Sequence, residues 1–447
     1  MPRGCPPLPD ATLVIRGGTV VGPEGSARLD VAVRAHTVVG LAESIEPPQG
    51  AVVLDAAGCL VGPGLVDLHT HLRQPGREEA ETIETGARAA ALGGYTAVVA
   101  MPNTEPAIDS AGVASEVLAL GTGCAAEVAV AGAITVGRAG TALAPLGELA
   151  ALGVTLFTDD GAGVQDGALM RRALDYAKGL GVTLAQHCED ACLAAGGAMH
   201  EGSWSSRLGI PGMPAAAEET MVARDITLAR LTGAPVHFLH LSTAGSVELV
   251  RRAKAEGLPV TAEAAPHHML LTHSAVEGYD TVFKVNPPLR TDEDVAAVVA
   301  GLCDGTIDAV ATDHAPHAPE SKEVPFDQAP PGMLGLQTAL PIAWEVLSPH
   351  MGAERVFALM SAQPAVIAKL TATDARAAGH SAQGGPVEVG AVANLCVFDP
   401  AATTVVDPTR LASRSRNTPY AGRSFAGAVR HTVLRGEAVV IDAVAQR

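Results

Sequence analysis

The sequence has 447 residues, 48% of them hydrophobic and 17% charged, which suits a globular enzyme with one large domain and a smaller one. Its formal net charge of -18 argues against nucleic acid as a partner, because an acidic surface repels phosphate backbones. No hydrophobic run approaches the roughly 20 residues of a membrane helix, and the start lacks the apolar core of a secretory signal. We therefore expect a cytoplasmic protein with no membrane partner.

Short strands separated by turns are predicted for the N-terminal part, residues 1–60. Valine and isoleucine alternate with small or polar residues in 12–21, 29–43 and 51–64, and Gly-Gly or Gly-Pro interrupts each run. The proline-rich first ten residues are expected to be frayed. No helical periodicity is visible before residue 60.

From residue 64 the pattern changes to hydrophobic runs that alternate with helical stretches. The helical stretches 81–94, 166–181 and 243–257 end in glycine, a common helix stop. Continuous hydrophobic runs are typical of parallel strands buried on both faces. Eight such units over about 250 residues predict an α/β fold, a TIM-type (β/α)8 barrel, rather than a doubly wound open sheet. The runs are 64–72, 95–103, 127–135, 154–160, 182–190, 235–243, 259–268 and 307–317.

Strand patterning returns at the C-terminal end, in residues 384–400 and 425–440. We expect three parts: 1–60, a barrel with its following helices over 61–379, and 380–447. The two end segments are predicted to pair into one small β-sandwich built from both chain ends.

Six side chains that can bind a metal lie at the C-terminal ends of five predicted strands. Barrel active sites form at that end, from residues on different strands. Two histidines spaced i, i+2 on one strand point to the same side. Imidazoles with carboxylates suit Zn²⁺, and six such ligands fit two metals that share a bridging carboxylate, about 3.5–4 Å apart. The six are His69, His71, Asp160, His187, His240 and Asp313.

Each of these residues also has a structural interpretation. The His69–His71 pair could be a polar strand edge, and His240 could be a core histidine. Asp160 could cap the helix after TDDG, although Asp159 is the better candidate for that cap. All of these interpretations would have to hold at five strand ends together, so we favour the metal site.

Other histidines and cysteines are not expected to bind metal. His267 and His268 could line the pocket, whereas Cys188 and Cys192 are expected to be small buried residues. Surface or packing roles are expected for His200, His237, His350, His380 and His431.

Eight motifs occur along the chain in this order: GLVDLHTHLRQPG, MPNTEP, TDDG, QHCED, HLST, EAAPHHMLLT, KVNPPLR and ATDHAPH. Together they resemble the type I dihydroorotases of the amidohydrolase superfamily. The resemblance covers nearly the whole chain and implies the same barrel and sandwich. HxH and ATDHAPH alone indicate only a cyclic amidohydrolase. MPNTEP together with KVNPPLR narrows the resemblance further, to the dihydroorotases.

The resemblance implies a set of metal ligands. His69, His71 and Asp313 would hold one Zn²⁺, His187 and His240 the second, and Asp160 with a hydroxide would bridge them. Hydantoinases and dihydropyrimidinases instead bridge their metals with a carboxylated lysine near the end of strand four. Here Asp160 occupies that place, and the nearest lysine, Lys178, lies in the next helical stretch.

Substrate contacts are implied in the same way. Arg73, Asn103 and His317 would bind the substrate carboxylate, for which a guanidinium offers two parallel hydrogen bonds. Asn286 matches the position that contacts the ring, and His71 also faces the substrate. The segment 320–335 resembles the loop that closes over substrate through Pro331 and Gly332; it could otherwise be an ordinary surface loop. Arg73 could otherwise form a surface ion pair.

The resemblance implies reversible hydrolysis of (S)-dihydroorotate to N-carbamoyl-L-aspartate in pyrimidine (UMP) biosynthesis. Asp313 would be the general acid and base for attack by the metal-bound hydroxide. The alternatives are another cyclic amidohydrolase (a hydantoinase, dihydropyrimidinase or allantoinase) and a non-catalytic scaffold for aspartate transcarbamoylase. A homo-oligomer and an association with aspartate transcarbamoylase are the partners that the family leads us to expect.

Overall fold

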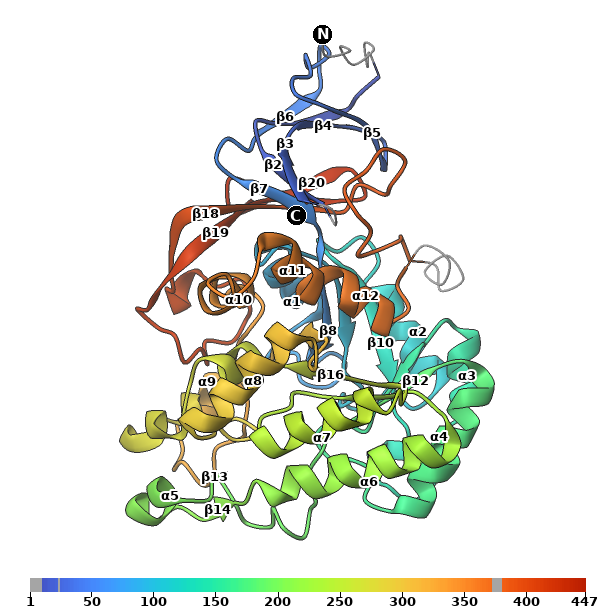
Figure 1. Ribbon diagram of the computed structural model, residues 1–447, viewed down its shortest axis with the longest axis vertical. Coiled ribbons are helices and arrows are strands. Elements are labelled where there is room, and N and C mark those ends of the chain that lie inside the picture. Colours follow the sequence, from blue (N-terminus) through green and yellow to red (C-terminus); the bar gives the residue numbers. More distant parts are fainter. Residues whose placement is uncertain (1–9, 23–24, 372–379) are drawn as a thin grey trace.

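The computed structural model describes residues 10–22, 25–371 and 380–447. A barrel of strands and helices forms the lower part of Figure 1, and strands from both ends of the chain, drawn blue and red, lie together above it. The expected fraying of the first ten residues falls almost wholly outside the described residues. The expected continuation of the helices to residue 379 also falls outside them in part.

Eight parallel strands form the barrel sheet, and each neighbour in sequence is a neighbour in space. Their residues are almost all buried, as expected for strands covered by helices on one face and packed against each other on the inner face. The strands are β8 (Leu65–Thr70), β9 (Tyr95–Ala100), β10 (Glu127–Gly132), β11 (Leu156–Phe157), β12 (Thr183–Gln186), β15 (Val236–Phe238), β16 (Val260–Ala264) and β17 (Ala309–Val310).

Contacts between the first strand and the residues after the last one close the barrel. Thr70 forms a parallel bridge with His314, and the His71 amide donates to the His314 carbonyl at 2.8 Å. The buried Asp67 carboxylate accepts from the Thr312 amide at 2.9 Å and from the Thr312 hydroxyl at 2.5 Å. The closed barrel is confirmed, and the open doubly wound sheet is wrong.

One helix follows each barrel strand and covers its outer face. Local signals set their ends: Thr82 and Thr291 form capping boxes, and Gly181 and Gly305 end their helices in the left-handed conformation. The helices are α1 (Ile83–Leu92), α2 (Ala111–Leu120), α3 (Leu146–Ala151), α4 (Gly167–Leu180), α6 (Ala216–Thr232), α7 (Ala244–Ala255), α8 (Asp292–Asp304) and α10 (Ala339–Leu347).

Short elements are inserted in two connections. The connection between β12 and α6 contains β13 (Met199–His200), α5 (Ser203–Leu208) and β14 (Gly212–Met213), and the one after β17 contains α9 (Pro319–Lys322). After α10 in the sequence, the helix α11 (Ala353–Phe357) continues through a π-helical turn into α12 (Gln363–Ile367).

The N-terminal end of the barrel is closed by the α12 region. Ala365, Ile367 and Leu370 pack with strand residues such as Val66 and Leu68 in one buried cluster. The Ser361 hydroxyl donates to the Gly64 carbonyl just before β8. With its N-terminal end covered by these described residues, the barrel offers its C-terminal end for a site.

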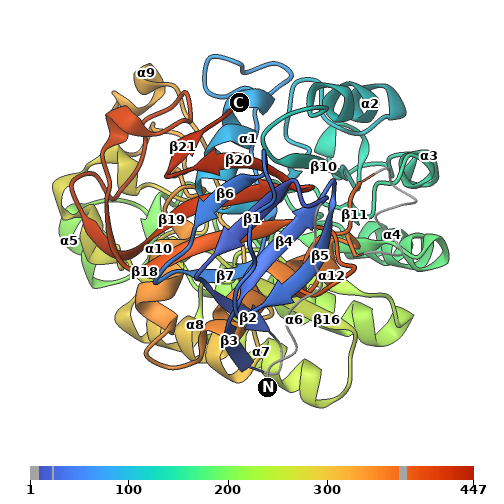
Figure 2. The same ribbon diagram turned by 90° about the horizontal axis from the view of Figure 1, so that it is seen from above.

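Two sheets form the smaller layer, as Figure 2 shows from above. A four-stranded sheet comes from the N-terminal end alone, and a seven-stranded sheet combines both ends because β7 pairs with β18. The predicted sandwich of both ends is therefore confirmed, while the boundaries at residues 61 and 380 stay a prediction. The strands are β1 (Leu13–Arg16), β4 (Asp30–Arg34), β5 (Thr37–Ala42) and β6 (Val52–Asp55) in the first sheet, and β2 (Thr19–Gly22), β3 (Gly25–Arg28), β7 (Leu60–Pro63), β18 (Leu395–Val405), β19 (Ser424–Leu434), β20 (Glu437–Ile441) and β21 (Val444–Ala445) in the second.

One hydrophobic core joins the two sheets. Ile15 and Val33 from the first sheet are buried with Val61, Leu395 and Val433 from the second. Burial of this kind stabilises the layer by about 25 cal/mol for each Å² of hydrophobic surface removed from water. Within the described residues, no helix has both the length and the hydrophobic character needed to cross a bilayer.

Candidate metal centre and active site

The six predicted ligands converge at the C-terminal end of the barrel. The ligand atoms of five of them, all but Asp313, form two groups, each with all atoms within 4.8 Å of one another, and every member is buried. Asp160 belongs to both groups and so lies where a bridging carboxylate would. The first group is His69, His71 and Asp160, and the second is Asp160, His187 and His240.

Asp160 follows β11 and faces imidazoles on both sides. Its Oδ1 lies 3.4 Å from His69 Nε2 and 3.5 Å from His187 Nδ1. The same oxygen lies 3.7 Å from His240 Nε2, and Oδ2 lies 3.6 Å from His71 Nε2. Burial acts to raise the pKa of Asp160, but the charge of His69 and hydrogen bonds from the imidazoles outweigh it and hold the pKa well below its usual range.

Asp313 follows β17 and reaches the first pair of imidazoles. Its Oδ1 lies 3.1 Å from His71 Nε2 and 3.6 Å from His69 Nε2. Burial would raise the pKa of Asp313, but the His71 hydrogen bond and the charge of His69 lower it. The backbone of Asp313 has a φ of 47°, which costs conformational energy in a non-glycine residue and is typical of functional sites.

Two neighbours prepare His69 and His71 to bind a cation through Nε2. His69 donates through Nδ1 to Glu263 Oε1 at 2.8 Å, and His71 donates through Nδ1 to Asn103 Oδ1 at 2.9 Å. Each donation leaves Nε2 facing the carboxylates of the site, and His69 Nε2 is buried with no hydrogen-bond partner among the described residues. Imidazoles oriented in this way, beside carboxylates, fit Zn²⁺, which would take the place of a proton on Nε2.

Glu263, a residue of β16, was not predicted from the sequence. It is completely buried and also lies 3.1 Å from His237 Nε2 through its Oε2. Burial acts to raise its pKa, but hydrogen bonds from His237 and His69 bring the pKa of Glu263 to about 2. The available signal was a glutamate inside the hydrophobic run VTAEA.

Asp159, the better of the two candidates for a helix cap, does not cap the following helix. Asp166 caps α4 by accepting from the amides of Ala168 and Leu169. The buried Asp159 carboxylate instead accepts from the amides of Ile134 at 2.9 Å and Thr135 at 3.0 Å. These bonds join the ends of β10 and β11 and so fix the chain beside Asp160.

A buried carboxylate outside the motifs fixes the residues after His240. Glu218 Oε1, on α6, accepts from the amides of Ser242 and Thr243, each at 3.1 Å. Arg290 donates to the Ser242 hydroxyl at 3.0 Å. The strand end that carries His240 is thus held by side chains from two other connections.

Residues that were not expected to bind metal lie outside both ligand groups. His267 and His268 are buried beside the site, and His268 Nε2 lies 3.0 Å from the Pro287 carbonyl. Lys178 is on α4 and donates to the Thr232 carbonyl at 2.7 Å. Cys188 is buried as expected, but Cys192 is exposed, so its predicted burial is wrong.

Five further histidines were expected to have packing or surface roles. His200, His237 and His431 are buried, and His350 is exposed. His380 is partly buried. None of these belongs to the two ligand groups found among the described residues.

Arg73 and His317 lie next to each other above the metal ligands. Arg73 is 7% exposed and donates through Nε to the Pro316 carbonyl at 3.1 Å. Burial lowers the pKa of Arg73 to about 10, and the charge of Arg77 adds to this effect. Burial lowers the pKa of His317 to about 3, and the charge of Arg73 contributes. Arg73 therefore stays charged at neutral pH while His317 is neutral.

The predicted substrate loop contacts His317 directly. His317 Nε2 donates to the Pro331 carbonyl at 2.8 Å. Gly332 has a φ of 144°, and a Cβ there would lie 2.7 Å from His317 Nε2, so only glycine fits this close approach. The structure thus brings His317, Pro331 and Gly332 together beside Arg73.

Asn103 and Asn286 lie on opposite sides of the ligand groups. Asn103 contacts His71 as described, whereas Asn286 Nδ2 lies 3.5 Å from His187 Nε2. Among the residues that the structure describes, the buried Asn286 Oδ1 has no hydrogen-bond partner. Two amide side chains therefore lie beside the ligand groups, one next to His71 and the other next to His187.

Comparison with known proteins points to one family. A family model described as "Dihydro-orotase-like" matches residues 58–246. The chain is 49% identical to the dihydroorotase of Pelotomaculum thermopropionicum, covering 97% of this chain and 99% of that protein. It is 48% identical to the dihydroorotase of Mycobacterium tuberculosis, covering 96% and 99%.

Solved structures with the same fold include two cyclic amide hydrolases. The L-hydantoinase (dihydropyrimidinase) from Arthrobacter aurescens superposes with a TM-score of 0.86, at 23% identity, over 98% of both chains. The dihydropyrimidinase from Brevibacillus agri NCHU1002 gives a TM-score of 0.82 at 24% identity, over 97% of this chain and 96% of that one. At this identity the likeness shows the shared fold.

Proposed function

Because this chain belongs to the dihydroorotase family, we propose that it catalyses the reversible hydrolysis of dihydroorotate to N-carbamoyl-L-aspartate. It is a metal-dependent cyclic amide hydrolase of pyrimidine biosynthesis. The observation that carries this function is the pair of ligand groups that share Asp160 at the open end of the barrel. All six ligands of the family pattern are present, which argues against a non-catalytic scaffold.

Two Zn²⁺ ions are the proposed cofactors. The groups around His69 and His71 and around His187 and His240 would hold one ion each, with Asp160 between them and Asp313 completing the first. When bound, such ions lower the pKa of water towards neutrality and polarise a carbonyl oxygen. The donor set of nitrogen and oxygen atoms supports zinc.

Asp313 is the proposed general acid and base. Its side chain is a carboxylate at neutral pH and lies beside the His69 and His71 imidazoles, where it would accept a proton from the attacking water. As the water oxygen bonds to the ring carbonyl carbon and the ring C–N bond breaks, Asp313 delivers this proton to the leaving nitrogen. In the synthetic direction the same carboxylate removes the proton from that nitrogen.

Arg73, Asn103 and His317 are the proposed binding groups for the substrate carboxylate, with Asn286 on the ring and Pro331 and Gly332 over it. The buried guanidinium of Arg73 is the one cation among these groups, and a carboxylate can accept two parallel hydrogen bonds from it. This charge supports a substrate with a ring carboxylate over hydantoin or dihydrouracil, which have none.

We expect Arg73→Ala to reduce kcat/KM for dihydroorotate by on the order of 100-fold, because a charged hydrogen bond contributes about 1.5–3 kcal/mol. Most of the change should be a higher KM. Steady-state kinetics with dihydroorotate, hydantoin and allantoin provide the measurement. Arg77→Ala is the matched control, since Arg77 is exposed and pairs with Glu105. An unchanged KM in Arg73→Ala, or faster turnover of hydantoin than of dihydroorotate by the unmodified protein, would contradict this assignment.

We expect Glu263→Gln to weaken metal binding by about 10–100-fold, because the amide no longer fixes the His69 ring as a carboxylate does. Competition with a chelator measures this affinity. Glu127→Gln is the control: Glu127 is a buried strand glutamate that accepts from Gln383, and β10 begins with it at the opposite end of the barrel. Equal metal affinity in the two variants would show that Glu263 has no such role.

The remaining partners stay predictions. We propose that the chain forms a homo-oligomer, that it associates with aspartate transcarbamoylase, and that it acts in the cytoplasm. Size-exclusion chromatography with and without that enzyme tests both associations. A monomer that does not co-elute with it would refute them.

A further inference from the structure

The connection between β18 and β19 leaves the sandwich and reaches the mouth of the barrel. Within it, the Ser415 hydroxyl donates to the Ala80 carbonyl at 2.7 Å, just before α1. The Ala412 amide donates to Gln337 Oε1 at 2.7 Å, just before α10. A segment from the C-terminal part of the chain is thereby fixed between two barrel connections.

Asn417, at the end of this segment, bonds two active-site stretches at once. Its Oδ1 accepts from the His317 amide at 3.1 Å, and its Nδ2 donates to the Ala315 carbonyl at 2.9 Å and the Gly332 carbonyl at 3.1 Å. Its own carbonyl accepts from the Leu334 amide at 3.1 Å. The side chain is 4% exposed, so these bonds are shielded from water.

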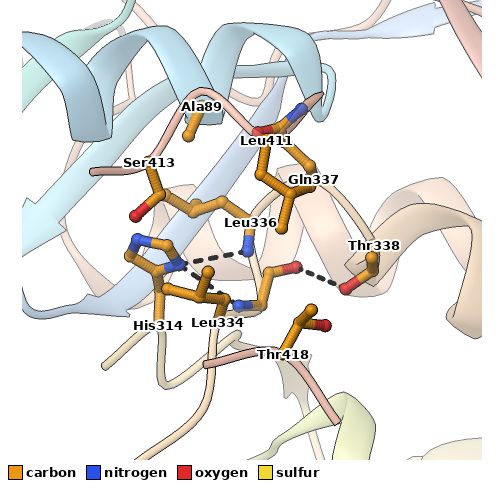
Figure 3. Close-up of a pocket in the computed structure, with 10 residues that line it drawn as sticks. Ala89, His314, Leu334, Leu336, Gln337, Thr338, Leu411, Ser413 and Thr418 are labelled. Carbon is orange, nitrogen blue, oxygen red and sulfur yellow. Dashed lines mark hydrogen bonds between the residues drawn. The ribbon is translucent and has the colours of Figure 1, made fainter. Parts of the chain in front are cut away.

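His314 holds the end of the 320–335 loop, close to Asn417. The ring accepts through Nδ1 from the Gly335 amide at 3.2 Å and, more weakly, from the Leu336 amide at 3.5 Å, as the dashed lines in Figure 3 show. Its Nε2 donates to Glu81 Oε2 at 3.3 Å, and Glu81 also accepts from the Ser413 hydroxyl. Backbone from residue 335 onward is therefore anchored. In the preceding stretch, the Gly332 amide donates to the Lys284 carbonyl and the Met333 carbonyl accepts from the Ala315 amide, each at 2.8 Å, while Asn417 binds the Gly332 carbonyl.

We propose that Asn417 is a positioning residue that sets the distance between His317 and the Pro331–Gly332 turn. This rests on the proposed function, in which these residues bind the substrate. Asn417 acts through backbone atoms: it holds the His317 amide and the Gly332 carbonyl, and the His317 ring then meets the Pro331 carbonyl. A misplacement of about 1 Å in such a frame can cost 100-fold in rate.

The same chain offers a matched asparagine with a structural role. Asn394, 5% exposed and directly before β18, also makes three side-chain hydrogen bonds. Its partners are Ser381, Ala382 and Arg435, next to the sandwich. If Asn417 served only the fold, Asn417→Ala and Asn394→Ala would behave alike.

The test compares Asn417→Ala with Asn394→Ala by thermal unfolding, metal content and steady-state kinetics on dihydroorotate. We expect both variants to lose stability and keep their metal, but only Asn417→Ala to raise KM, by on the order of tenfold or more. Cleavage after Glu323, an exposed loop residue, by a glutamate-specific protease should also be faster in Asn417→Ala alone. If Asn417→Ala does not fold, Asn417→Asp replaces it, since it keeps the acceptor for His317 and loses both donors.

Two results would overturn the proposal. They are an unchanged KM and cleavage rate in the Asn417 variant, and equal changes in the Asn394 variant. Absence of dihydroorotate turnover in the unmodified protein would instead refute the proposed function. In that case, faster cleavage in the Asn417 variant alone would still show that the native Asn417 side chain restrains the loop.

Discussion

Replacing Asp313 with asparagine is expected to lower kcat for dihydroorotate by on the order of 10³-fold, because general acid–base catalysis contributes about 10²–10⁴. The amide has the shape of the carboxylate but cannot accept a proton at neutral pH. The depressed pKa of Asp313 indicates that the native group is ionised there. Stopped assays of hydrolysis and of ring closure should show the loss in both directions, since one group serves both.

A control variant separates this effect from general damage. Asp166→Asn changes an exposed helix cap on the connection after β11, and we expect near-normal turnover from it. Metal content and thermal unfolding are measured on the same samples, because Asp313 also lies 3.1 Å from His71 Nε2. Near-normal kcat in Asp313→Asn would rule out its role as acid and base.

Replacing Asp160 with alanine is expected to abolish measurable turnover and to remove at least one metal ion per chain. The carboxylate faces imidazoles of both ligand groups, so its loss affects both sites. Each 1.36 kcal/mol lost from transition-state stabilisation costs tenfold in rate, and metal catalysis supplies several kcal/mol. Metal analysis of the purified variant, with kinetics on dihydroorotate, measures both effects.

Asp159→Asn is the natural comparison for Asp160→Ala. Asp159 is the adjacent buried carboxylate, and its bonds go to the Ile134 and Thr135 amides. We expect this variant to unfold at a lower temperature and to retain its metal. Full metal content and activity in Asp160→Ala would show that Asp160 does not bridge.

Much of the site could be predicted because polar residues interrupt hydrophobic runs where each barrel strand ends. His69 and His71 close the first run, and His240 closes the sixth, and a barrel brings these ends together. The fold followed from the same periodicity. Both predictions use only local pattern and the geometry of parallel strands.

The supporting residues could not be predicted, since their partners lie far away in the sequence. Glu263 and His69 are 194 positions apart, and Asn417 and His317 are 100 apart. A local pattern carries no information on such pairs. The alternative of a helix cap at Asp159 fails for the same reason: its sequence position suits a cap, but the amides of Ile134 and Thr135, after β10, bind its carboxylate.

Metal content and dihydroorotate hydrolysis, measured on one preparation before chelation, after chelation and after return of Zn²⁺, test the account most directly. The arrangement of His69, His71, His187 and His240 around Asp160 predicts two ions per chain, loss of activity when they are removed, and recovery when zinc is restored. Hydrolysis that continues unchanged in metal-free protein would contradict it.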